Sequence, residues 1–158
     1  MQITRSSPMQ PRFYGMFGGE WEFVIDIVNC WKQGAWGVIV GKQSLLYDRT
    51  PKRGECALLI ASAHLQLGNR NEFNLLIKLA LEWQCDPDLI RTILVSGVYN
   101  SAGKFHALRH NMPRAASNFA IAVKPLCSET SSRFFSDARM MQQLKDLGLP
   151  NRILNYDE

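Results

Sequence analysis

The chain has 158 residues, of which 46% are hydrophobic and 20% charged, and its formal net charge is +4 at pH 7. This length suits one domain, and the composition excludes wholesale disorder. The charge is compatible with an acidic partner but is too small to indicate nucleic-acid binding by itself. No uninterrupted apolar run reaches the length that spans a membrane.

The two ends of the chain are expected to lie outside the folded part. Residues 1–17 lack the apolar core of a signal peptide, so we expect a flexible N-terminal segment. Residues 18–150 are expected to form a single helical domain, and residues 151–158 a C-terminal tail.

Cysteine spacing gives no metal or redox motif. The cysteines are Cys30, Cys56, Cys85 and Cys127, and no two of them form a CxxC pair. Zinc-ribbon and thioredoxin-type sites therefore have no support. We expect reduced thiols in a cytoplasmic protein that carries no cofactor.

The first predicted element is an amphipathic helix that ends near Gly34. Its apolar residues recur at helical spacing: Trp21, Val24, Val28 and Trp31. Residues 36–46 are ambiguous, since ValIleVal between Gly37 and Gly41 would also suit a short strand. The chain offers no second strand to pair with it, and we therefore favour a helix.

Residues 55–83 predict two helices joined by a tight turn. The stretch 55–67 is apolar nearly all round, which predicts a helix packed on more than one side. Gly68 ends this helix, and Asn69 or Asn71 is expected to cap the next. The second helix has a narrow polar stripe at Asn74, Lys78 and Glu82, each four residues apart.

A second helix pair is predicted over residues 87–124. Asp86 suits the N-cap and Pro87 the first helical position. Gly103 lies within the following apolar pattern, where a small residue allows another helix to approach closely near Ala115 and Phe119. Residues 111–113 form the turn of this pair, and a last helix is expected from Phe134 to Leu147. The expected fold is all-α, with antiparallel helix pairs and about six or seven helices in a solenoid or bundle.

The small residues of these helix pairs resemble those of the tetratricopeptide repeat family. The matching positions are Ala61, Gly68 and Ala80 in the first pair, and Tyr99, Ala102, Gly103, Ala115, Phe119 and Ala122 in the second. Phe73 departs from the pattern, because a small residue is expected there. Gly103 follows Ala61 by 42 residues, whereas the family repeats every 34 or so. A non-repetitive helical bundle is the alternative.

The resemblance implies a binding groove on the concave side of the repeats. The residues expected to face it are Leu58, Ser62, Gln66, Asn100, Lys104 and Leu108. The leading hypothesis is a protein-interaction module, such as an adaptor, an assembly factor or an accessory domain of a larger enzyme. Its partner would be another protein or peptide, and the chain itself is expected to be a monomer or weak dimer.

Two other functions remain as hypotheses. A small helical enzyme or redox protein with a spatially assembled site is the second, and a nucleic-acid-binding domain, supported by the basic residues near Lys104 and Arg109, is the third. Residues 81–110 are also similar to the carboxymuconolactone-decarboxylase-type family, whose peroxidase members use a CxxC motif that Cys85 lacks. His106 and His110 have the four-residue spacing of zinc ligands on a helix, but no further ligand is indicated. We therefore predict no metal and no catalytic residue.

Overall fold

The computed structural model describes residues 18–46 and 50–151, which form seven α-helices and two short 3-10 helices without a β-strand. The predicted all-α class is confirmed. The predicted N-terminal segment 1–17 and all but the first residue of the predicted tail lie outside the described residues. In chain order the elements are α1 (Gly18–Gln33), α2 (Trp36–Gly41), η1 (Gln43–Leu45), α3 (Arg53–Gln66), α4 (Arg70–Glu82), α5 (Pro87–Leu108), α6 (Met112–Val123), η2 (Lys124–Leu126) and α7 (Glu129–Asp146).

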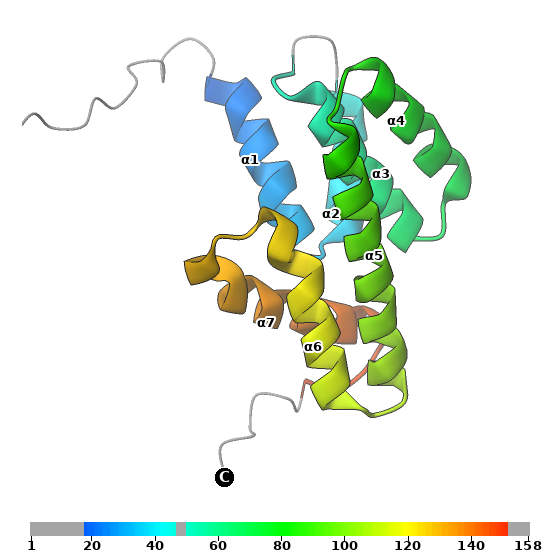
Figure 1. Ribbon diagram of the computed structural model, residues 1–158, viewed down its shortest axis with the longest axis vertical. Coiled ribbons are helices and arrows are strands. Elements are labelled where there is room, and N and C mark those ends of the chain that lie inside the picture. The colour runs from blue at the N-terminus through cyan, green and yellow to red at the C-terminus, as the bar shows by residue number, and fades with distance from the viewer. Residues whose placement is uncertain (1–17, 47–49, 152–158) are drawn as a thin grey trace, which may run out of the picture.

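Two helix hairpins, α3–α4 and α5–α6, form the body of the fold (Figure 1). The first two helices, α1 and α2, pack against α3, and α7 crosses behind α5 and α6 and reaches α1. The inner side of α3 and α5 is therefore covered by helices from both ends of the chain. Residues 36–46, which were ambiguous in sequence, form α2 and η1, so the preferred helical interpretation is confirmed.

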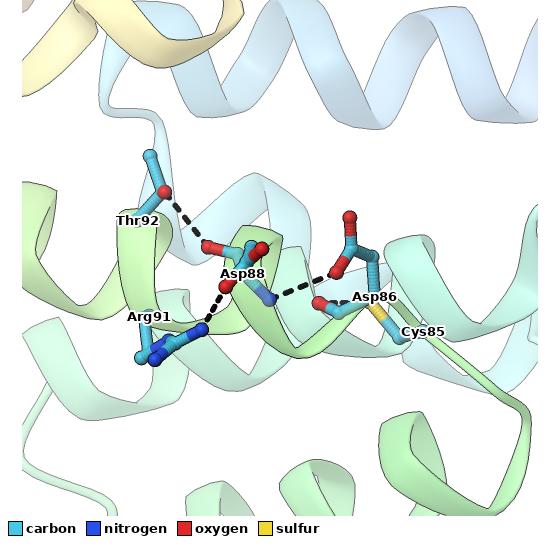
Figure 2. A network of polar contacts seen from close by, with 5 residues as sticks. All are labelled: Cys85, Asp86, Asp88, Arg91 and Thr92. Carbon is cyan, nitrogen blue, oxygen red and sulfur yellow. Dashed lines mark hydrogen bonds and ion pairs between the residues drawn. The ribbon is translucent and has the colours of Figure 1, made fainter.

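The start of α5 follows the predicted capping chemistry (Figure 2). The Asp86 carboxylate accepts a hydrogen bond of 2.9 Å from the backbone N–H of Asp88, and Pro87 occupies the first turn. In the same turn Arg91 pairs with the Asp88 carboxylate, and the Thr92 hydroxyl donates to the Asp88 carbonyl at 2.8 Å. The bond from Asp88 to Asp86 satisfies one of the backbone N–H groups that a helix N-terminus leaves open, and α5 begins where the sequence predicts.

Two other helix starts differ from expectation. The last helix begins at Glu129 rather than at Phe134, because Ser128 is its N-cap and accepts a hydrogen bond of 3.3 Å from the backbone N–H of Ser131. Asn69 occupies the N-cap position of α4, but its side chain makes no capping hydrogen bond. The position of the N-cap was therefore predicted correctly, but the expected capping hydrogen bond is absent.

Gly34 is the residue that allows α1 to end against α7. Its φ of +74° lies in the left-handed region, which favours glycine. A Cβ at this position would also lie only 2.6 Å from Cδ of Arg139. The turn after α1 thus requires a glycine for its backbone conformation and again for the approach of the arginine side chain.

The hydrophobic core is centred on α3, as its apolar sequence predicts. Every residue from Cys56 to His64 is buried, and α1, α2, α4 and α5 contribute apolar side chains to the same cluster. A smaller cluster joins α5, α6 and α7 around Phe119. The predicted close crossing at Gly103 is confirmed, since a Cβ there would lie 2.7 Å from the Phe119 ring.

Candidate docking surface on α5 and α6

A buried arginine organises the interior between the helices. Arg139 of α7 is fully buried, and its guanidinium lies 4.8 Å from the ring centroid of Trp31 and 4.7 Å from that of Trp36. It donates hydrogen bonds to the carbonyls of Trp31 and Lys32, the latter at 3.1 Å, and to Oδ1 of Asn100 at 3.0 Å. These contacts join α7 to the end of α1, to α2 and to the middle of α5.

None of the described hydrogen-bond partners of Arg139 is a carboxylate. Its charge is balanced instead by the carbonyl end of α1, where the helix dipole is negative, and by the electron-rich faces of two tryptophan rings. Burial lowers the pKa of Arg139 to about 9, so the side chain stays protonated at neutral pH. Removing it would take a donor from three acceptors on two helices, α1 and α5.

Gln143 and Asn100 extend this interior network. Gln143 Oε1 accepts hydrogen bonds from Nε1 of Trp36 at 3.0 Å and from Nδ2 of Asn100 at 3.1 Å, and its own Nε2 donates to the Gly34 carbonyl at 3.2 Å. Asn100 Nδ2 also donates to Oε1 of Gln66 at 3.0 Å. The polar side chains on the inner face of α3 and α5 thus have partners inside the molecule.

This arrangement corrects the predicted groove. Leu58, Ser62 and Asn100 are buried, so no partner reaches them in this structure. Gln66 and Lys104 are half-buried, and Leu108 is exposed. The six predicted residues do not form one open surface. Their side of α3 and α5 is filled by α1, α2 and α7, and Ser62 accepts a hydrogen bond of 2.9 Å from Nε1 of Trp31.

The opposite side of α5 carries an exposed apolar row. Val95, Val98, Tyr99 and Phe105 are 54%, 68%, 37% and 55% exposed. Val98 and Tyr99 follow Val95 by three and four residues, and Phe105 follows Tyr99 by six. At helical periodicity these four positions share one side of the helix, away from the buried Ile93, Ser96, Asn100 and Gly103. We define these four residues as the outer row of α5. Such a row on a folded domain is typical of an interaction surface.

A groove lies beside the outer row, between α5 and α6. It has a volume of about 380 Å³ and is lined by Arg91, Thr92, Val95, Ser96, Tyr99, Ile121, Lys124 and Pro125. Ser96 donates a hydrogen bond to the Ala122 carbonyl across its floor, which holds the two helices together. Ile121 on α6 is 42% exposed and extends the apolar surface beyond α5. The α5–α6 groove therefore combines apolar side chains from both helices with the polar and cationic side chains of Arg91, Thr92 and Lys124.

Cations outnumber carboxylates around the groove, where the Asp88 carboxylate at the start of α5 pairs with Arg91. Residues 89–128 contain no aspartate or glutamate, while their cationic residues are Arg91, Lys104, Arg109, Arg114 and Lys124. Arg91 and Lys124 line the groove, and beyond it the guanidinium of Arg109 lies 5.6 Å from the ring centroid of Phe105 at the end of the outer row. Lys104 is half-buried and faces inward; burial lowers its pKa, and nearby Asp146 acts in the opposite direction.

The histidines and cysteines do not meet in a shared site. His64 is buried, and its Nε2 lies 2.6 Å from Oε1 of Gln43; burial lowers the pKa of this histidine, and Glu72 opposes the shift. His106 lies on α5, whereas His110 follows its end with a φ of +56°, so the helical spacing of this pair is lost. No group of three potential metal ligands occurs among the described residues.

The four cysteines are free, and two of them lie in the interior. Burial is the main cause that raises the pKa of Cys56 to about 12 and that of Cys85 to about 11. Neutral thiols of this kind are poor nucleophiles. Neither the α5–α6 groove nor a cavity of about 530 Å³ beside α7 is lined by a histidine or a cysteine.

Comparison with known proteins adds no relative. No protein-family description, no curated protein and no solved structure matches this chain. Among the described helices, none is both long and apolar enough to cross a membrane.

The sequence of α5 indicates the outer row through an excess of apolar residues, but the apolar pattern does not show which of them are exposed. Within α5 the apolar residues occupy more positions than one buried face of a helix can use. Val98 and Phe105 are part of that excess, and in the sequence they cannot be distinguished from the apolar residues of α5 that enter the core. Arg139 gave no signal of its own, because its partners are as many as 108 residues away.

Proposed function

We propose that this domain is a protein-binding module and that its docking surface is the outer row of α5 together with the α5–α6 groove. The observation that carries the proposal is the exposed apolar row of Val95, Val98, Tyr99 and Phe105 on a helix whose other side is fixed in the core. A rigid helix that presents aromatic and aliphatic side chains offers contact area with little loss of conformational entropy on binding.

The rest of the structure supports a scaffold for this surface. α5 is held at its start by the Asp86 cap, in its middle by the Asn100–Arg139 hydrogen bond and towards its end by packing of Gly103 on Phe119. Binding surfaces on such rigid elements hold their geometry better than surfaces on loops. The interaction-module hypothesis thus remains, but on the outer side of the helices rather than on the predicted inner groove.

Site-specific photo-crosslinking tests this proposal. A benzophenone amino acid placed at Val98 should give a defined protein adduct in the source cell. The same group at Val38 is the matched control, because this valine of α2 is also exposed, at 52%. The adduct at position 98 should disappear when Val95→Asp is added. Equal adducts at both positions, or an adduct that survives Val95→Asp, would contradict the proposed surface.

A further inference from the structure

The charges around the outer row narrow the chemistry of the partner. The hairpin of α5 and α6, with its turn and Lys124 directly after it, has five lysine and arginine residues and one carboxylate, that of Asp88, which pairs with Arg91. The whole chain has a formal charge of only +4, so the positive charge is concentrated on this hairpin. An acidic partner is favoured here and a basic one repelled.

The positions of the cations define a pattern along the helix. Arg91 and Lys124 line the α5–α6 groove before the outer row begins, and Arg109 lies against Phe105 after it ends. At about 1.5 Å of rise per residue, the row from Val95 to Phe105 spans roughly 15 Å, and Arg91 and Arg109 are about 27 Å apart along the helix axis. These lengths correspond to about three and five helical turns.

We infer that the docking surface takes an acidic amphipathic helix from another protein, a conclusion that depends on the proposed function. The partner helix would have about five turns, with an apolar stripe over the central three turns and carboxylates near both ends. Its stripe would cover Val95, Val98 and Tyr99, and its carboxylates would pair with Lys124 at one end and Arg109 at the other. Recognition combines burial of apolar surface with charge complementarity that steers association.

A second copy of this chain suits the surface less well. Two such faces brought together would place Lys124 and Arg109 of one copy near the same cations of the other, and the one carboxylate of the hairpin, Asp88, already pairs with Arg91. Nucleic acid would use the same cations and would stack on Tyr99 and Phe105. The other two members of the row, Val95 and Val98, offer neither a stacking ring nor a hydrogen bond to a base, so half of the row would stay uncovered.

The experiment compares two synthetic helical peptides of about five turns in fluorescence anisotropy. The acidic peptide has a leucine stripe over its middle and glutamates at both ends, and its twin has lysine at every glutamate position. The acidic peptide should bind at least tenfold more tightly than the twin, and its affinity should fall as salt rises. A thymidine oligonucleotide and anionic phosphatidylserine vesicles are measured in the same way.

Two variants and two matched controls identify the surface. Val98→Asp should weaken the acidic peptide at least tenfold, and Lys124→Glu should weaken the acidic peptide while strengthening its lysine twin. Val38→Asp on α2 and Lys78→Glu on α4 change exposed residues of the same kinds elsewhere, and they should leave both affinities unchanged. Circular dichroism should show the same helix content for all four variants, because each position is exposed.

The outcomes separate this inference from the proposed function. If both peptides bind equally and Val98→Asp abolishes both, the docking surface is supported and the acidic partner is refuted. If neither peptide responds to Val98→Asp, both proposals fail. If the oligonucleotide or the vesicles bind more tightly than the acidic peptide and lose affinity with Lys124→Glu but not with Val98→Asp, the surface serves a polyanion instead of a helix.

Discussion

Replacing Gly103 tests how closely α5 and α6 pack. A Cβ built at this position lies 2.7–2.9 Å from three atoms of the Phe119 ring, whereas ordinary contacts are 3.4–4 Å. The ring is fully buried in the cluster between α5, α6 and α7, so moving it away from position 103 would displace its neighbours. Overpacking of this kind costs about 1–3 kcal/mol, while replacing glycine by alanine within a helix gains up to about 1 kcal/mol.

Gly103→Ala should therefore be destabilised by about 1 kcal/mol net, which lowers the melting temperature of a domain this size by about 2–4 °C. Gly103→Leu adds further carbons at the same contact and should lose about 3 kcal/mol or more. Thermal unfolding followed by circular dichroism at 222 nm measures both. In a Phe119→Leu background the cost of Gly103→Ala should shrink, because the smaller side chain leaves room for the new methyl group.

Gly37→Ala is the matched control for this series. Gly37 lies within α2, and no heavy atom would be within 4 Å of an added Cβ. Only helix propensity then acts, so this variant should be stabilised by roughly 0.5–1 kcal/mol. If Gly103→Leu melts at or above the parent temperature, position 103 does not face Phe119, and the packing of α5 on α6 described above is refuted.

Three further predictions concern the interior. Arg139→Lys keeps the positive charge but loses the planar fork that bonds to three acceptors, and it should be destabilised by about 3 kcal/mol in urea unfolding; a loss below about 0.5 kcal/mol would show that the network contributes little. Burial lowers the pKa of His64 in the folded state, so the unfolded chain takes up a proton first as the pH falls through its unperturbed value of about 6.5. Stability should accordingly be retained above pH 6.5 and decline below it, and the decline should be smaller in His64→Gln when unfolding is compared at pH 7.5 and 5.5. Iodoacetamide at pH 8 should label the half-buried Cys30 in the native protein but reach the buried Cys56, whose pKa is about 12, only after unfolding; mass spectrometry of the labelled peptides would reveal the opposite order.

The helices were largely predictable because their ends depend on local chemistry. Asp86 and Pro87 define the start of α5 through contacts within the first turn, and Gly34 ends α1 through its own backbone conformation. The small residue at Gly103 also predicted a close helix crossing correctly. The predicted start of α7 at Phe134 is five residues too late, because the helix has its N-cap at Ser128.

The side of the helices that carries the proposed docking surface could not be predicted in the same way. Ser62 and Asn100 are polar, and the repeat resemblance assigned them to a groove. In the structure they bond to Trp31 and Arg139, which lie 31 and 39 residues away in the chain, and these contacts enclose them. No local spacing reveals such partners. The exposed outer row could not be recognised from the sequence either, because valine and phenylalanine, as at Val98 and Phe105, are residue types that usually lie in a core.

The proposed docking surface consists of the outer row of α5 and the α5–α6 groove. The most direct test is to titrate the acidic helical peptide into isotopically labelled protein and to follow the backbone amide resonances by nuclear magnetic resonance. The largest shifts should fall at Val95, Val98, Tyr99, Phe105 and Ile121, while α4 remains unchanged. Shifts centred on α4 or on the inner residues Leu58 and Ser62, with α5 and α6 unaffected, would contradict it.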